Sequence, residues 1–164
     1  GVPSAGLHTN GYSLARRVLF DASGYTPDTF VDELGMTVAD ALLAPHRSYL
    51  HLVRPLLDQD RIKGLAHITG GGMTENVPRM LPAGCAAEIR PGSWVVPPIF
   101  RLLERNGNIA HDEMLRAFNM GIGLVVACPA DDADGVVDAI ARSGEPHPVR
   151  LGHVVAGDRT VEYR

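Results

Sequence analysis

The chain has 164 residues, 45% of them hydrophobic, with a formal net charge of −4 and a pI near 5.9. That length suffices for one domain with a sizeable core, and division into two domains is not expected. The acidic balance, without a cluster of Lys and Arg, argues against a nucleic-acid binder, because affinity for a duplex depends on cations that neutralise phosphates.

The sequence also points away from membranes and secretion. It contains no apolar run near the ~20 residues that span a bilayer, and its first residues lack the basic and apolar regions of a signal peptide. Its two cysteines, Cys85 and Cys128, form no C-x-x-C pattern, so neither a disulfide framework nor a zinc site is indicated. We therefore expect a cytoplasmic protein that binds neither membranes nor nucleic acid.

The first residues suggest a piece of a longer polypeptide. The chain starts with GVPSAGLHTNGYS, without a methionine and directly in what reads as the end of a strand followed by a turn. We therefore expect residues 1–164 to form a single domain, with an earlier part of the parent polypeptide missing.

Two short helices are predicted in the first part of the chain. Residues 11–20 carry apolar side chains one turn apart, and Asn10 stands where an N-cap would. Residues 38–44 form the second helix, since Thr37 and Asp40 are spaced as a capping box and a proline follows.

A strand and a third helix are expected next. Pro55 is best placed at the first position of a helix over residues 54–59, where its missing N–H costs nothing. Residues 47–52, immediately before it, then read as a strand.

The stretch GLAHITGGGMTENVPRM stands out in the middle of the chain. It reads as a buried strand over residues 65–69, three consecutive glycines, and a helix that opens at Thr74 and covers residues 75–81. Glycine loses more conformational freedom on folding than other residues and adds nothing to a core. Either a tight strand-to-helix turn or a ligand that needs bare backbone explains such a run.

The rest of the chain alternates between strand and helix patterns. Pro97 and Pro98 introduce a helix that ends at Gly107 and Asn108. A terminal hairpin with its turn near Gly157 and Asp158 is expected. Other strands are predicted over residues 86–89 and 124–128, and other helices over 111–118 and 131–141. The alternation predicts an α+β domain with a mixed β-sheet covered by helices.

Three polar turns that contain glycine lie at junctions between strands and helices. In mixed α/β sheets such turns bind ligands, because helix N-termini present free N–H groups there. The backbone amides of the glycine run, with Thr69, Thr74 and Asn76 beside them, would suit a phosphate or another oxygen-rich group. The turns are GLHTNGYS (6–13), ITGGGMTEN (68–76) and FNMGIG (118–123).

The sequence lacks a self-sufficient nucleotide site. Gly70, Gly71 and Gly72 are not followed by the G-K-[ST] of a P-loop, and no G-x-G-x-x-G follows the first strand. His8, between two glycines, is a candidate to donate to a bound substrate or exchange a proton with it near neutral pH. The alternative is a turn histidine bonded to nearby backbone.

No metal site is predicted from the spacing of ligands. His46 and His51 lack i, i+4 spacing, and no H-E-x-x-H pattern occurs. His67 reads as a buried strand histidine that meets its own hydrogen bonds. The acidic residues around Asp131 are interpreted as a helix-capping cluster.

Four segments carry a resemblance to a known family: GLHTNGYSLARRV, GLAHITGGGMTENVPRML, WVVPPIF and FNMGIG. In this order they resemble the C-terminal domain of the phosphoribosylformylglycinamidine cyclo-ligases, also called aminoimidazole ribonucleotide synthetases. The resemblance runs from Gly1 to at least Cys128. The end of the chain offers no distinctive match.

The resemblance implies an ATP-dependent, homodimeric ligase of purine biosynthesis with an α/β/α layered C-terminal domain. ATP phosphorylates the amide oxygen of formylglycinamidine ribonucleotide, and ring closure gives aminoimidazole ribonucleotide. ATP and Mg²⁺ are then bound mainly by the absent N-terminal domain, so this chain alone should be inactive. The substrate side of the cleft would be lined by His8, Asn10, Gly11, Thr69, Gly70, Gly71, Gly72 and Asn76, with Asn119 and Gly121 as further candidates.

Two alternatives remain open at this stage. Thiamine-monophosphate kinases and selenophosphate synthetases share the architecture and use ATP on another acceptor, whereas a related hydrogenase maturation protein would need a reactive C-terminal cysteine that Tyr163 and Arg164 do not provide. The chain could also be a non-catalytic binding module in which the glycine turns serve the fold alone.

Overall fold

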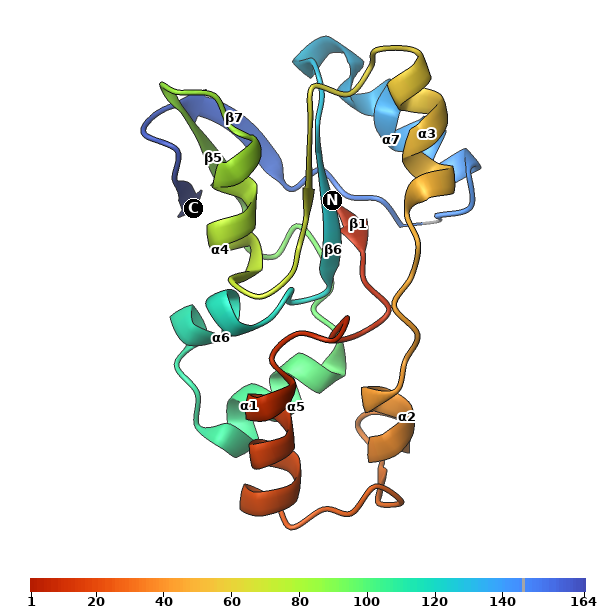
Figure 1. The fold of residues 1–164 in the computed structure, drawn as a ribbon, viewed down its shortest axis with the longest axis vertical. Coiled ribbons are helices and arrows are strands. Elements are labelled where there is room, and N and C mark those ends of the chain that lie inside the picture. Colours follow the sequence, from red (N-terminus) through yellow and green to blue (C-terminus); the bar gives the residue numbers. More distant parts are fainter. Residues whose placement is uncertain (146) are drawn as a thin grey trace.

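The computed structural model describes residues 1–145 and 147–164. Its central sheet has the order β1-β6-β4, with β1 (Val2–Pro3) and β4 (Gly64–His67) both antiparallel to β6 (Ile122–Ala127). β6 therefore joins the first residues of the chain to the strand that leads into the glycine run (Figure 1).

A second sheet has the order β7-β5-β8 and the mixed pairing that the sequence predicts. β5 (Cys85–Ile89) is antiparallel to β7 (Gly152–Ala156) and parallel to β8 (Val161–Tyr163). The predicted terminal hairpin is therefore wrong, because β7 and β8 pair with opposite edges of β5 and not with each other. The turn between them wraps around the start of β5, where Gly157 N–H donates to Gly84 O at 3.0 Å.

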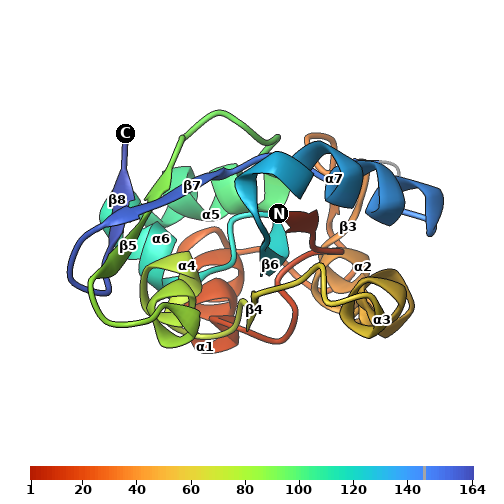
Figure 2. The same ribbon diagram turned by 90° about the horizontal axis from the view of Figure 1, so that it is seen from above.

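The two faces of the central sheet are covered differently. α3 (Leu50–Asp58) and α7 (Ala133–Arg142) lie on the side away from the second sheet (Figure 2). There Leu52, Leu56 and Ile140 pack with Leu124 of β6. On the other face, β4 and β6 share a core with α4 (Gly72–Asn76), the 3₁₀ turn Val77–Met80 and β5. The α+β class is thus confirmed, with the strands divided between two sheets.

A separate helical core lies below the central sheet in Figure 1. It is formed by α1 (Tyr12–Arg16) with the π-helical turn Arg17–Ala22, α2 (Val38–Leu42), α5 (Pro98–Gly107) and α6 (His111–Ala117). The edge-to-face pair of Phe100 and Phe118, with ring centroids 5.9 Å apart, lies within it. β2 (Phe30–Val31) and β3 (Met36–Thr37) form a small antiparallel ribbon at its edge.

Local capping signals explain the helices that the sequence predicts correctly. Thr37 and Asp40 form the expected capping box at the start of α2. Pro98 is the first residue of α5, and Asn108 ends that helix in the left-handed conformation with φ 45°. α7, preceded by a 3₁₀ turn over Ala130–Asp132, confirms the helix predicted over residues 131–141.

Three local predictions are corrected. Residues 47–52 do not form a strand, because α3 begins at Leu50 and contains Pro55 in its interior. Burial of Leu52, Val53 and Leu56 on one helical face outweighs the hydrogen bond that Pro55 removes. Gly11, with φ 66°, stands at the N-cap of α1 in place of Asn10, and α4 begins at Gly72 instead of Thr74. Among the described residues, no helix has the length and apolar character needed to cross a bilayer.

Candidate functional site

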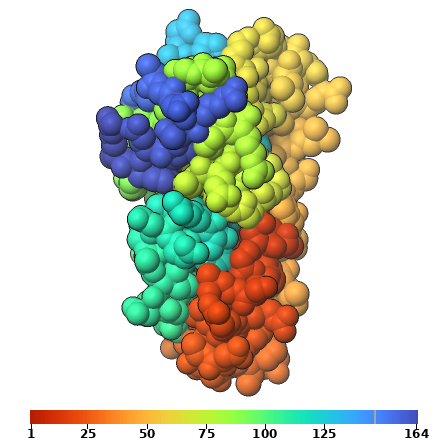
Figure 3. Space-filling view, turned by 60° about the vertical axis from the view of Figure 1, so that its left-hand side comes forward, coloured from red at the N-terminus to blue at the C-terminus, as the bar shows by residue number. Residues whose placement is uncertain are grey.

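The three glycine turns lie together in the fold, and residues 118–123 connect the other two. The side-chain amide of Asn119 donates to Gly6 O at 2.9 Å. On the other side, Ile68 N–H donates to Gly123 O at 2.9 Å. The segments that carry the three turns adjoin one another at the surface, where the red, teal and yellow-green regions meet (Figure 3).

The fold requires two of the three consecutive glycines. Gly72 has φ 58°, and a Cβ atom there would lie 1.9 Å from the carbonyl oxygen of Leu115. Gly71 has φ 96°, a conformation that is costly for residues with a side chain. Gly70 is different, because it is exposed, has no positive φ, and a Cβ atom there would have no described heavy atom within 4 Å. Gly70 therefore leaves bare backbone at the surface without a local steric reason.

Asn76 shapes the glycine turn from beneath. It is only 4% exposed, and its side-chain N–H groups face the carbonyl oxygens of Thr69, Gly70 and Gly72 at 3.3, 3.2 and 2.8 Å. Its Oδ1 accepts a hydrogen bond from Thr69 Oγ1 at 3.2 Å. The structure therefore places this predicted site residue as a support for the loop and not at its surface.

Asn119 and Gly121 have a similar supporting place. Asn119 is fully buried, and its Oδ1 accepts from Gly121 N–H at 2.8 Å and from Ser4 Oγ at 3.0 Å. Gly121 is buried with φ 99°, and a Cβ atom there would lie 2.4 Å from Pro97 Cδ. Both residues fix the position of the turn at residues 118–123.

The remaining predicted residues reach the surface of the three turns. Asn10, Gly11, Thr69 and Gly71 are half-buried. Asn10 Nδ2 donates to His8 O at 2.9 Å, which leaves its Oδ1 free of a described partner. Gly11 packs closely against Phe118, since a Cβ atom there would lie 2.3 Å from the ring. These residues, with Gly70, offer the polar groups that a ligand of the three turns would meet.

His8 lies beneath this surface, only 2% exposed, in the left-handed conformation with φ 52°. Its Nε2 accepts a hydrogen bond from Ala5 N–H at 2.9 Å, and its Nδ1 has no partner among residues 1–145 and 147–164. Burial, with smaller contributions from His46, His67 and Arg47, lowers the pKa of His8 to about 4. The ring is therefore neutral at neutral pH, and because Nε2 accepts, the proton resides on Nδ1.

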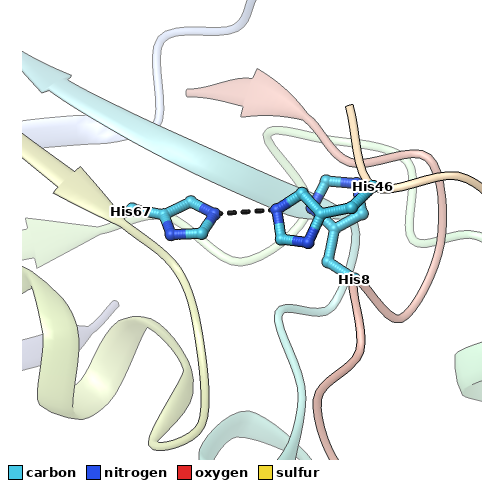
Figure 4. A group of neighbouring side chains, drawn as sticks. All are labelled: His8, His46 and His67. Atoms are coloured by element: carbon cyan, nitrogen blue, oxygen red, sulfur yellow. Dashed lines mark hydrogen bonds between the residues drawn. The ribbon is translucent and has the colours of Figure 1, made fainter. Parts of the chain in front are cut away.

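Two further histidines approach His8 from other segments (Figure 4). The ring of His46, in the coil between α2 and α3, stacks on His8 with centroids 4.2 Å apart and planes 20° apart. His46 Nε2 lies 3.0 Å from Nε2 of His67, the last residue of β4. His67 is exposed, so the prediction of a buried strand histidine is wrong. Burial of part of its ring, and then the neighbouring His46, lower its pKa.

Polar anchors hold the segment that carries His46. Arg47 forms an ion pair with Glu145, a carboxylate that is 2% exposed. Tyr49 donates its hydroxyl to Pro3 O at 3.0 Å, and burial raises the pKa of that hydroxyl. Gly123 makes room for this packing, since a Cβ atom there would lie 1.9 Å from Tyr49 Oη and 3.0 Å from His8 Cε1.

This histidine cluster was not predictable from sequence, because its members come from three separate segments. Spacing rules detect ligands on one helix or one loop, and His46 and His67 are 21 residues apart. One ligand nitrogen from each of His8, His46 and His67 lies within 4.8 Å of the others. No local pattern in the sequence predicts that these three histidines lie close together.

A well-formed cavity lies away from the three turns. It has a volume of about 340 Å³ and lies between β5, β6, α7 and the segment that leads into β7. None of the predicted site residues lines it. The candidate site is therefore the surface of the glycine turns and the histidines beside it.

Comparison with known proteins gives a consistent result. The model of the family described as "AIR synthase related protein, C-terminal domain" matches residues 1–164. The chain is 50% identical over 157 residues to the phosphoribosylformylglycinamidine cyclo-ligase of Bifidobacterium longum subsp. infantis, covering 95% of this chain and 45% of that protein. With the cyclo-ligase of Geobacter metallireducens it shares 51% identity over 165 residues, which cover 99% of this chain and 47% of that protein.

Among solved structures, the chain is similar to HypE from E. coli, with a TM-score of 0.58 and 22% sequence identity. The match covers 99% of this chain and 45% of HypE, and at that identity it concerns the fold alone. The chain spans about half the length of the curated relatives that it matches, 45% and 47% of the two cyclo-ligases above.

Proposed function

Because the chain belongs to the family of AIR synthase related proteins and matches their C-terminal domain, we propose that it is the C-terminal domain of an ATP-dependent cyclo-ligase of purine biosynthesis. The whole protein would convert formylglycinamidine ribonucleotide to aminoimidazole ribonucleotide, by phosphorylation of the amide oxygen and closure of the imidazole ring. The names and identities of the curated relatives support this activity. A homodimeric, cytoplasmic parent belongs to the same proposal.

The observation that carries the proposal is the convergence of the first two glycine turns on the third, residues 118–123. The reaction asks mainly for positioning of the amide oxygen against a phosphoryl group and of the attacking nitrogen against the activated carbon. A rigid surface of backbone N–H groups suits that task. Gly70, Gly71 and Thr69 would contact an oxygen-rich part of the substrate, with Asn76 and Asn119 as positioning residues.

His8 would act as a neutral hydrogen-bond donor. Because its pKa is lowered to about 4, the His8 ring is neutral at neutral pH and has no imidazolium proton to transfer. Its Nδ1–H has no described acceptor, and its backbone carbonyl accepts from the side chain of Asn10 at the surface. A substrate oxygen or nitrogen that reached this position would satisfy the buried donor.

The residues of this chain do not fit the Mg²⁺ that the reaction needs. Mg²⁺ takes oxygen ligands, whereas the one group of neighbouring ligands among the described residues consists of three histidines. ATP would supply the phosphoryl group, and we propose that the N-terminal domain of the parent holds ATP and Mg²⁺. The chain alone should therefore not turn over.

The test is product formation by the parent-length protein. ADP release with ATP and Mg²⁺ should depend on formylglycinamidine ribonucleotide and match the formation of aminoimidazole ribonucleotide. Asn10→Ala and Gly70→Ala should raise KM or lower kcat, while Asn106→Ala, whose side chain donates to Ser23 outside the turns, should leave both unchanged. A folded parent that binds ATP but ignores this substrate would refute the proposal and favour another acceptor. Turnover by the 164-residue chain alone would refute the placement of ATP.

A further inference from the structure

We propose that His8, His46 and His67 bind a single transition-metal ion of the zinc class. This site shares His8 with the proposed substrate surface, but nothing in the proposed cyclo-ligase reaction requires a metal ion there. The three rings meet where the first glycine turn, the coil before α3 and the end of β4 come together (Figure 4).

The separations between the ring nitrogens suit a shared ion. Zinc binds imidazole nitrogens at about 2.0–2.1 Å, and a tetrahedral arrangement then places two ligand nitrogens about 3.3 Å apart. The two Nε2 atoms of His46 and His67 are 3.0 Å apart, close to that value. The ligand nitrogen of His8 lies within 4.8 Å of both, so sharing one ion also requires the stacked rings of His8 and His46 to reorient.

The buried ring of His8 supplies the second, independent observation. It is 2% exposed, and its Nδ1 has no hydrogen-bond partner among the described residues. Buried polar atoms without partners are rare in native proteins, so an unmet nitrogen on a ring of the ligand cluster points to a missing partner. A metal ion bonded to this ring would provide one.

Metal binding must replace the hydrogen bond between Nε2 of His46 and Nε2 of His67, and it must also change the one that His8 accepts. His8 Nε2 now accepts from Ala5 N–H at 2.9 Å. Ligation through Nε2 replaces that bond directly, and ligation through Nδ1 moves the ring proton to Nε2, which can then no longer accept. Either route releases the Ala5 amide, and because Ala5 is exposed, water can take its place. The Ala5 amide is therefore a reporter for His8 ligation.

The surroundings select the kind of metal and leave room for a further ligand. Imidazole nitrogens suit zinc, copper, nickel and iron, whereas magnesium and calcium prefer oxygen. His46 and His67 are both exposed, so a fourth coordination position can face solvent. The Arg47–Glu145 pair and the Tyr49–Pro3 hydrogen bond hold the His46 segment in place before any metal arrives.

The experiment is a titration of the 164-residue chain with Co²⁺ and with Zn²⁺ alone, followed by cobalt visible absorption and by calorimetry. We expect one equivalent to bind, and His46→Ala and His67→Ala each to weaken binding by at least about tenfold. His51→Ala is the matched control, because His51 is exposed on α3 and lies outside the cluster. Circular dichroism shows whether each variant remains folded.

His8 is tested in the wild-type chain, so that a folding defect of a His8 variant cannot obscure the result. In ¹H–¹⁵N spectra, one equivalent of Zn²⁺ should shift the Ala5 amide and the ring signals of all three histidines. Failure to bind one equivalent, or binding that His46→Ala and His67→Ala leave unchanged, would overturn the site. Shifts confined to the rings of His46 and His67 would overturn His8 as a ligand.

Discussion

The side-chain amide of Asn119 donates to the carbonyl of Gly6 at 2.9 Å, across 113 residues of sequence. The same side chain accepts from Gly121 N–H at 2.8 Å and from Ser4 Oγ at 3.0 Å. One buried amide thus ties the first glycine turn to the third. The mutual position of the two turns depends on this residue.

Asn119→Ala should therefore destabilise the fold and disturb the site together. The substitution removes three hydrogen bonds and leaves buried polar partners unmet, for which we expect a loss of about 2–4 kcal/mol in the free energy of unfolding. Urea denaturation measures it. Asn106→Ala is the control, because Asn106 makes a single partly buried bond to Ser23 Oγ at 3.1 Å. Equal losses of unfolding free energy in Asn119→Ala and Asn106→Ala would contradict the conclusion that Asn119 holds the two turns together.

The neighbouring glycines of the central run should respond in opposite ways to alanine. Gly72→Ala places a methyl group 1.9 Å from the Leu115 carbonyl at a φ of 58°, and should cost at least about 2 kcal/mol of stability. Gly70→Ala meets no described atom within 4 Å and should change stability by less than about 0.5 kcal/mol. Thermal unfolding of both variants checks this. A large loss for Gly70→Ala would mean that the fold, and not a ligand, needs that glycine.

A bidentate ion pair should give part of the stability its pH dependence. Arg61 Nε and Nη2 donate to the two carboxylate oxygens of Asp132 at 2.7 and 2.6 Å. The hydrogen bonds from Arg61 lower the pKa of Asp132 in the folded chain. The unfolded chain then takes up a proton first, so this stabilisation is present above pH ~4 and is lost as the pH falls through the folded pKa.

Arg61→Met is the variant that tests this dependence. Its deficit in unfolding free energy relative to wild type should be constant between pH ~7 and ~5 and should shrink below pH ~4. Urea denaturation at several pH values provides the comparison. Arg54→Met is a suitable control, since the exposed Arg54–Asp58 pair on α3 should contribute little at any pH. A deficit for Arg61→Met that persists unchanged at low pH would show that packing and not charge is responsible.

Elements with local signals were predictable from sequence, and elements decided by distant contacts were not. The capping box of Thr37 and Asp40 and the proline at the start of α5 act within one turn, so they fix helix ends wherever the helix packs. The predicted strand over residues 47–52 failed because the burial of one face of α3 overrides a local rule about Pro55. β8 was assigned to the wrong partner because the free edge of β5 is visible only in the folded chain.

The candidate site shows the same division. The glycine turns carry a composition signal, and the hydrogen bonds of Asn119 bring the first and the third of them together. Which residues lie on that surface depends on packing, and packing turned Asn76 inward. The exposure of His67 and its approach to His46 result from where β4 and the coil before α3 end in space. The spacing of these two histidines in the sequence predicts neither the exposure of His67 nor its approach to His46.

The last strand should stabilise the helix that follows the glycine run. The hydroxyl of Tyr163 on β8 lies 2.9 Å from Thr74 Oγ1 on α4, and burial raises the pKa of the tyrosine. Tyr163→Phe and Thr74→Val should each cost about 0.5–1.5 kcal/mol, the usual net value of one such hydrogen bond.

Because both substitutions remove the same bond, the double variant should be scarcely less stable than the less stable of the two single variants. The coupling free energy from urea denaturation of all four proteins measures this difference. Strictly additive losses would mean that the two hydroxyls act separately, and that β8 covers α4 without fixing it. Strong coupling would instead make the final strand a support for the glycine turn, a role that its remote position in the sequence does not suggest.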